Sequence, residues 1–236
     1  MKLAIMQPYF FPYLGYFQLI HSTDKFILFD DVQYIRRGWI NRNRILKPED
    51  GVQYITMPIV EHSRDTLIKN IKISNDSEWK FKIIRQLEHY KKKAPFYNQT
   101  MQLITACFDN NEKNIALFNA SCLRAVCDYI GMDCSIEISS NMNFNYSNVN
   151  DAGEWALRIC DQLKASEYIN PCGGKNLFSE EKFSVNGIKL NFIYPNLPEY
   201  NQRRNSFEAG LSIIDMMMNV SPENIFKYLN EFEIKK

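Results

Sequence analysis

Two adjacent acidic residues are the first candidates for chemistry in this sequence. Asp30 and Asp31 directly follow the apolar run of residues 25–29, which we predict to be a buried strand. Gln33 comes two residues later. Two neighbouring carboxylates could bind Mg²⁺ or orient a sugar hydroxyl, and Asp30 and Asp31 are candidate catalytic residues. A strand-end turn with solvated carboxylates fits the same pattern, so both interpretations stay open.

A dense polar segment follows the two acids. Its candidate residues are Arg36, Arg37, Trp39, Asn41, Arg42, Asn43 and Arg44. The arginine fork matches the geometry of phosphate oxygens, so the segment could bind a diphosphate. Trp39 within it favours a surface that binds a ring. Salt bridges from the arginines to Asp30, Asp31 or Glu49 are the structural alternative.

The first loop of the chain, residues 7–16, combines prolines, aromatic residues and a glycine, and we call it the opening loop. Its candidate binding residues are Gln7, Tyr9, Tyr13, Gly15 and Tyr16. Tyr13, Gly15 and Tyr16 have the spacing of the H-x-G-H signature of adenylyl-transferring α/β enzymes, whose glycine allows close approach of the nucleotide. Tyrosine replaces both histidines and is neutral at pH 7. The loop is therefore a degenerate nucleotide site, or Gly15 permits close packing between helix and strand.

Two further loops place polar groups after predicted strands. Ser139 and Ser140 end the strand of residues 135–138 and are weakly similar to the serine-rich strand end that contacts phosphate in the same enzymes. A helix cap or turn cap is the alternative for these serines. His62 lies in the turn between two predicted strands, which makes it a candidate general base.

A glycine-rich turn follows the predicted strand of residues 167–169. It contains Gly173, Gly174 and Lys175, which offer backbone amides and a cation to an anionic ligand. An ordinary tight turn is the alternative. The spacing does not match a phosphate-binding P-loop.

Composition indicates an ordinary globular protein. The chain has 236 residues, of which 45% are apolar and 23% charged, and its net charge is +1. This small charge gives no reason to expect nucleic acid as a partner. No stretch approaches the roughly 18 apolar residues of a membrane span. The six cysteines match no zinc-site spacing, so we expect reduced, buried thiols in a cytoplasmic protein and predict no metal site.

The predicted elements must bring these candidates together. Strands are expected at 2–6, 25–29, 52–58, 68–73, 135–138, 167–169 and 188–193, the last after a hairpin turn at 186–187. Helices are expected at 13–22, 78–93, 97–108, 113–130, 151–163, 206–219 and 222–233. The first strand, helix and strand form a βαβ unit, which implies parallel pairing. We predict an α/β fold with a largely parallel Rossmann-like sheet, as one domain of residues 1–236 with a helical lobe near 75–130.

Several of these segments together resemble the WbqC-like protein family. The matching pieces are Met6 to Tyr9, Gly15 to Phe17, Asp24 to Asp30 with Val32 and Gln33, Trp39 to Asn43, Trp79 with Tyr90 and Pro95, Ser139 with Ser140, Tyr168 to Pro171 with Gly173 to Lys175, and Leu211 to Asp215. The resemblance extends over nearly the whole chain. It implies a setting in bacterial surface polysaccharide biosynthesis, including O-antigen, and acyl or glycyl transfer to an amino sugar. It carries over no catalytic residues.

Three hypotheses for function follow. The first is N-acyl or aminoacyl transfer to a nucleotide-linked amino sugar, with ATP and Mg²⁺ or another acyl donor as the activating group. The second is a non-catalytic protein that binds a nucleotide sugar or a partner enzyme. The third is a glycosyltransferase, in which Asp30 and Asp31 would form a metal–diphosphate site. The sequence leaves the oligomeric state open.

Overall fold

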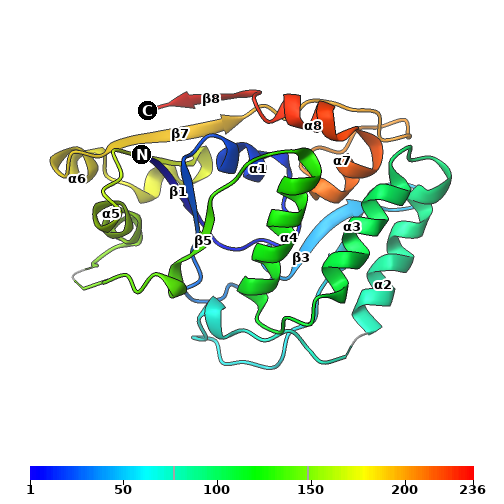
Figure 1. Ribbon diagram of the computed structural model, residues 1–236, viewed down its shortest axis with the longest axis horizontal. Helices are drawn as coiled ribbons and strands as arrows, with labels where there is room; N and C mark the ends of the chain where they lie inside the picture. The colour runs from blue at the N-terminus through cyan, green and yellow to red at the C-terminus, as the bar shows by residue number, and fades with distance from the viewer. Residues whose placement is uncertain (77, 148) are drawn as a thin grey trace.

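A central sheet of six strands organises the chain (Figure 1). The computed structural model describes residues 1–76, 78–147 and 149–236. Every neighbouring pair of strands in the sheet is parallel except the last, β7 with β8. In spatial order the strands are β5 (Ile136–Ile138), β2 (Lys25–Leu28), β1 (Lys2–Met6), β6 (Glu167–Pro171), β7 (Lys189–Pro195) and β8 (Phe232–Lys235).

The five parallel strands follow the Rossmann order. Counted along the chain, they lie in the sheet as 3-2-1-4-5. The chain runs outward from β1 through β2 to β5, then returns past β1 to β6 and β7. The order reverses between β1 and β6, and sheets of this kind bind ligands outside the carboxyl ends of the strands at that switch point. The predicted α/β fold with a largely parallel sheet is confirmed.

Alternating side chains of the strands pack into two separate cores. Ala4, Phe26 and Leu28 face one core, whereas Leu3 and Ile27 face the other. This alternation follows from the two-residue period of a strand. The first core is covered by α1 (Leu14–His21), α4 (Ile115–Ile130), α7 (Ile213–Asn219) and α8 (Pro222–Tyr228), and the second by α5 (Ala152–Gln162) and α6 (Glu180–Val185).

The chain between β2 and α4 forms a separate group of elements beside the sheet (Figure 1). It contains the antiparallel pair β3 (Arg42–Leu46) and β4 (Val52–Thr56), then η1 (Ile68–Asn70), α2 (Glu78–Leu87), η2 (Glu88–Lys92) and α3 (Tyr97–Asp109). Helices do fill the predicted helical segment. Its last helix, α4, packs against β5 and thus belongs to the layer that covers the sheet.

Several predicted elements differ from the structure. The strand predicted at 68–73 is wrong: η1 occupies its first half, and the rest makes only isolated bridges. Ile68 and Ile71 are both buried, and this spacing of three residues suits a 3₁₀ turn. The hairpin predicted at 186–187 is also wrong, because Asn186 caps α6 and β7 pairs in parallel with β6.

The carboxyl-terminal helices are shorter than predicted. The helix expected at 206–219 begins only at Ile213, with Ser212 as its N-cap. The helix expected at 222–233 ends at Tyr228, and β8 follows it as an edge strand antiparallel to β7. All six cysteines carry free thiols. Among the described residues, no helix is both long and apolar enough to cross a membrane.

Candidate functional site

Asp30 ties together the carboxyl ends of β2 and β5. Its side chain is 2% exposed, and its carboxylate accepts hydrogen bonds from Ser139 Oγ at 2.8 Å, Ser140 N at 3.0 Å and Ser140 Oγ at 2.7 Å. The two serines begin η3 (Ser139–Asn141) directly after β5. The structure therefore brings three predicted site residues together and uses the Asp30 carboxylate to anchor them.

Asp31, the next residue along the chain, forms a charged cluster beside this anchor. Its carboxylate accepts from Lys69 Nζ at 2.8 Å and from Tyr146 Oη at 2.9 Å. Burial by itself raises the pKa of Asp31, but hydrogen bonding with Lys69, Ser139 and Tyr146 and the charge of Lys69 outweigh it and hold that pKa below its ordinary value. Asp31 is thus ionised at neutral pH.

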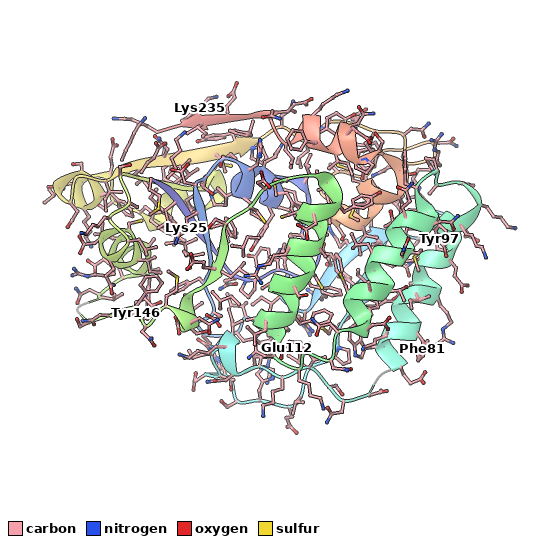
Figure 2. All side chains as sticks on the ribbon, viewed as in Figure 1. Lys25, Phe81, Tyr97, Glu112, Tyr146 and Lys235 are labelled. Carbon is pink, nitrogen blue, oxygen red and sulfur yellow. The ribbon has the colours of Figure 1, made fainter. Side chains whose placement is uncertain are left out.

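A cleft of about 390 Å³ opens in front of Asp31, and we call it the Asp31 cleft. Its lining residues are Asp31, Leu67, Lys69, Ser139, Ser140, Asn143, Phe144, Tyr146 and Trp155. Tyr146 lies on the loop that leads from β5 towards α5 (Figure 2), and its ring centroid is 4.7 Å from that of Trp155 on α5. Aromatic faces beside ionised and hydroxyl groups suit a sugar ring or another polar ring.

The acidic pair does not offer a Mg²⁺ site. The Asp30 carboxylate is enclosed by three donors, and Lys69 places an ammonium group 2.8 Å from Asp31. A divalent cation at Asp31 would meet the repulsion of that ammonium group. Across the described residues, no group of three or more His, Cys, Asp or Glu side chains is arranged to hold a metal ion. A carboxylate has about four lone-pair sites, so Asp31 can still accept from a ligand hydroxyl or amine.

Buried side chains fix the opening loop at the switch point. Asn43 Nδ2 donates to the carbonyls of Phe10 at 3.0 Å and Phe11 at 2.9 Å, and Ser212 Oγ donates to Phe11 O at 2.7 Å. On the other side, Asn119 Nδ2 donates to Pro8 O at 2.8 Å. Ser212 is also the N-cap of α7, so it ties this helix to the loop. Asn43, predicted to bind a ligand, makes these contacts with the loop, and its ligand-binding role stays a prediction.

The tyrosines of the opening loop have different environments. Tyr16 is fully buried, and its hydroxyl donates to Gln7 O at 2.8 Å, so it packs inside the fold. Tyr13 folds over Gly15, where an added Cβ would lie 2.4 Å from the Tyr13 ring. Burial raises the pKa of Tyr13, and the nearby Cys172 adds to this effect. Gln7, Tyr9 and Tyr13 remain partly accessible at the carboxyl end of β1.

The glycine-rich turn forms η4 (Cys172–Leu177) at the carboxyl end of β6. An added Cβ at Gly174 would lie 2.4 Å from Asn170 Nδ2, whereas one at Gly173 would meet open space. Lys175 Nζ donates to the Lys236 carbonyl at 3.2 Å and lies 5.7 Å from the Phe192 ring centroid. Gly173 thus borders the switch point, and Lys175 contacts β7 and the end of the chain.

Arginines and aromatic rings alternate on the β3–β4 pair. Trp39 stacks on Tyr54 with ring centroids 6.5 Å apart and planes at 28°. The Arg42 guanidinium lies 4.4 Å above the Tyr54 ring and that of Arg44 5.6 Å above Trp39. Within the described part of the chain, no ion pair links these arginines to acids. The backbone N–H of Phe10 donates to Trp39 O at 2.9 Å, which places this group beside the opening loop.

The remaining predicted residues make local contacts. Gln33 Nε2 donates to Arg64 O at 2.6 Å, and Arg36 donates to His62 O at 3.4 Å. Asn41 Oδ1 accepts from Tyr34 Oη at 2.8 Å. His62 does not line the Asp31 cleft, so the structure does not join this candidate base to the acid. Sequence reasoning missed Lys69, Tyr146 and Trp155, because no motif in the sequence marks any of them.

A Rossmann-order sheet with polar and aromatic groups along its carboxyl edge defines the class: an α/β protein with a mostly parallel six-stranded sheet. The chain belongs to the WbqC-like protein family, whose model matches residues 7–227. It is 32% identical over 230 residues to the Mycobacterium tuberculosis protein named "Uncharacterized protein Rv1507c". The aligned region covers 94% of this chain and 95% of that protein. No solved structure is significantly similar to the chain.

Proposed function

We propose that the protein is a cytoplasmic enzyme of bacterial surface polysaccharide biosynthesis, O-antigen included, that transfers an acyl or aminoacyl group to the amine of a nucleotide-linked amino sugar. The observation that carries the proposal is the Asp31 cleft, where an ionised carboxylate lies beside the faces of Tyr146 and Trp155. Family membership supports the setting.

The cleft suits an amino sugar in two respects. A sugar ring presents apolar C–H faces, which stack on aromatic rings such as Trp155. An amino group in its protonated form is attracted to an ionised carboxylate, and Asp31 is ionised because Lys69 and Tyr146 hold its pKa down. In this arrangement the nucleotide extends along the carboxyl edge towards the opening loop, with Tyr13 and Arg44 as candidate contacts.

The reaction itself joins the sugar nitrogen to an acyl carbon. The free amine attacks the carbonyl of an acyl donor, a C–N bond forms, the bond from the carbonyl to the leaving group breaks, and the amine gives up a proton. An acyl thioester, or a carboxylate that ATP has activated as an acyl adenylate, supplies such a carbonyl. Preorganised donors at the carboxyl edge would stabilise the developing oxyanion.

One observation favours a second candidate function, that of a non-catalytic nucleotide-sugar-binding protein. A general base works best when its pKa lies near the working pH, and the pKa of Asp31 is shifted downwards. Asp31 thus holds a cation well but accepts a proton poorly. The glycosyltransferase hypothesis has less support, because the Lys69 ammonium group lies 2.8 Å from Asp31, where a metal–diphosphate site would need a cation.

Ligand binding and product formation separate these functions. We expect UDP-glucosamine to raise the melting temperature of the wild-type protein, and Asp31→Asn to weaken that binding at least about tenfold, the effect of losing one charge-assisted contact. Asp65→Asn, which changes an exposed acid on a neighbouring loop, serves as the matched control. Circular dichroism verifies that each variant folds.

Mass spectrometry of the sugar nucleotide then tests catalysis. Incubation with acetyl-CoA, or with ATP and glycine, should add the mass of the acyl group to UDP-glucosamine. Binding without an acylated product would support the binding protein instead. No response to UDP-glucosamine, ATP or acetyl-CoA would overturn both functions.

A further inference from the structure

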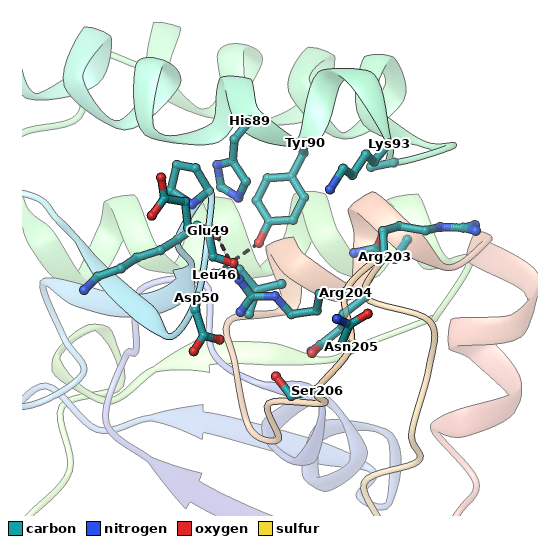
Figure 3. A pocket seen from close by; sticks show the side chains of 15 residues that line it. Leu46, Glu49, Asp50, His89, Tyr90, Lys93, Arg203, Arg204, Asn205 and Ser206 are labelled. Carbon is teal, nitrogen blue, oxygen red and sulfur yellow. Dashed lines mark hydrogen bonds between the residues drawn. The ribbon is translucent and has the colours of Figure 1, made fainter.

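A second cavity, of about 400 Å³, lies between the β3–β4 turn, η2 and the loop of residues 202–206 (Figure 3). We call it the basic pocket. It shares no lining residue with the Asp31 cleft. Its volume is within the range of small-molecule sites, roughly 300–1,000 Å³. Neither the proposed function nor the predicted site residues account for it.

Cationic side chains without partners line this pocket. Lys47, Lys93 and Arg203 make no side-chain hydrogen bond or ion pair with any other residue that the structure describes. Figure 3 shows the Lys93 ammonium group directed into the cavity beside Tyr90. Unpaired lysine and arginine groups around one concave surface attract an anionic ligand.

Arg204 adds a fixed positive charge to the pocket. Its guanidinium donates to the carbonyls of Lys47 at 3.2 Å, Glu49 at 2.5 Å and Gly51 at 3.2 Å, which holds the β3–β4 turn in place. Carbonyls satisfy its donors without neutralising its charge. Four cationic side chains line the pocket, against the two carboxylates of Glu49 and Asp50, so its lining carries a net positive charge.

Two unpartnered acceptors also line the pocket. His89 Nδ1 lies 2.8 Å from Gln86 O and therefore carries the proton, which leaves a lone pair on the buried Nε2. Burial lowers the pKa of His89, and the ring is neutral at pH 7. Asn219 is 8% exposed, and its Nδ2 donates to Asp215 O at 2.9 Å while its buried Oδ1 has no partner. Buried acceptors without donors are rare in folded proteins and point to a missing group that donates hydrogen bonds.

The base of the pocket is rigid. Tyr90 Oη and Tyr200 Oη both donate to the buried carboxylate of Asp215, and Gln202 Nε2 donates to it at 3.1 Å. Tyr90 Oη also accepts from Leu46 N at 3.3 Å. This network joins η2, β3, the 202–206 loop and α7, so the lining residues are held in position before a ligand arrives.

We propose that the basic pocket binds a phosphorylated polyol, of which a sugar phosphate is the simplest example. The phosphate accepts hydrogen bonds from Lys93 and its cationic neighbours, and ligand hydroxyls donate to His89 Nε2 and Asn219 Oδ1. Inorganic phosphate would pair with the cations but would leave both acceptors unpaired. A neutral sugar would donate to the acceptors but would leave the cations unpaired. The pocket is a separate site, and its occupancy does not depend on the function proposed for the Asp31 cleft.

Calorimetric titration of the full chain with glucose 1-phosphate, inorganic phosphate and glucose tests this proposal. We expect glucose 1-phosphate to bind at least tenfold more tightly than either phosphate or glucose. Lys93→Gln should weaken glucose 1-phosphate and phosphate alike by tenfold or more. His89→Leu should weaken glucose 1-phosphate severalfold and leave phosphate binding unchanged, a selectivity that a general loss of structure would not produce.

Matched variants make the outcome decisive. Lys92→Gln removes an exposed lysine from the same element outside the pocket and should leave every affinity unchanged. Asp31→Asn should also leave glucose 1-phosphate binding unchanged, which keeps this test separate from that of the proposed function. Equal affinity for phosphate and glucose 1-phosphate, or full binding by Lys93→Gln, would overturn the proposal.

Discussion

Asn43 donates both amide hydrogens to carbonyls of the opening loop, and its Oδ1 accepts from Arg44 N at 2.8 Å. The side chain is 4% exposed. Phe11, one of its two partners in the loop, has a φ of 41°, a conformation that bulky residues rarely adopt. Such a backbone persists only where its surroundings hold it, and Asn43 supplies two of the hydrogen bonds that do so.

Asn43→Ala should therefore act on stability. It removes two hydrogen bonds to the opening loop and leaves the Phe10 carbonyl unpaired, whereas the Phe11 carbonyl keeps its bond from Ser212, and we expect a loss of about 2–4 kcal/mol in the free energy of unfolding. Urea denaturation followed by circular dichroism measures this loss. Asn111→Ala, at an exposed position, should change stability by less than about 0.5 kcal/mol. A loss below about 1 kcal/mol for Asn43→Ala would show that the loop keeps its shape without these bonds.

At the residue scale, sequence could predict the neighbours that the sheet brings together. Asp30 and Ser139 meet because the strands before them are adjacent and parallel, so their carboxyl ends share one edge. Tyr146 reaches Asp31 across a separation of 115 residues through an irregular loop, which no periodic pattern encodes. The contacts of Asn43 with the opening loop could not be predicted either, because the sequence does not show whether an asparagine side chain contacts a ligand or a backbone carbonyl.

The first helix begins with a contact that only a glycine allows. Tyr13 is the N-cap residue of α1, and its ring lies over Gly15 so closely that an added Cβ would be 2.4 Å from it. From the sequence, Gly15 was expected to allow either the close approach of a nucleotide or close packing between the helix and a strand. In the structure the Tyr13 side chain fills that space, so any ligand that approaches the helix here must displace the ring.

A double-mutant cycle measures this contact. Gly15→Ala should destabilise the wild-type protein by about 1 kcal/mol or more, because the Tyr13 ring must move. In a Tyr13→Ala background the same change should stabilise the protein by up to about 1 kcal/mol, because alanine favours the helix over glycine. Thermal and urea unfolding of the four proteins give the coupling energy. Equal effects of Gly15→Ala in both backgrounds would contradict the ring contact.

At the element scale, the local sequence pattern predicted the buried central strands of the sheet but missed the partly exposed strands β3 and β8. The strands of the sheet centre were visible as short apolar runs, because both of their faces are buried. β3 was hidden by its polar residues: Arg42 and Arg44 turn outward, and only Asn43 and Ile45 are buried before Leu46. β8 is a four-residue edge strand directly after α8, and its alternation is too short to distinguish from a continuing helix.

At the scale of the whole molecule, the two regions proposed to bind ligands are separate. The Asp31 cleft is formed by loops that follow β2 and β5, with α5 beside them. The basic pocket is formed by η2, the β3–β4 turn, the 202–206 loop and the end of α7. The two regions have no residue in common, and each has its own rigid base: the Asp30 anchor in one and the Asp215 network in the other.

Two separate sites predict additive stabilisation. When two ligands bind the folded state independently, their free energies of stabilisation add, and each contributes about 2.7 kcal/mol at a hundredfold excess over its dissociation constant. Glucose 1-phosphate and UDP-glucosamine together should therefore raise the free energy of unfolding by the sum of their separate effects. In the Lys93→Gln variant only the contribution of glucose 1-phosphate should be lost, and in Asp31→Asn only that of UDP-glucosamine. If the second ligand adds nothing in the wild-type protein, the two compete for one site, and the assignment of a distinct ligand to each region fails.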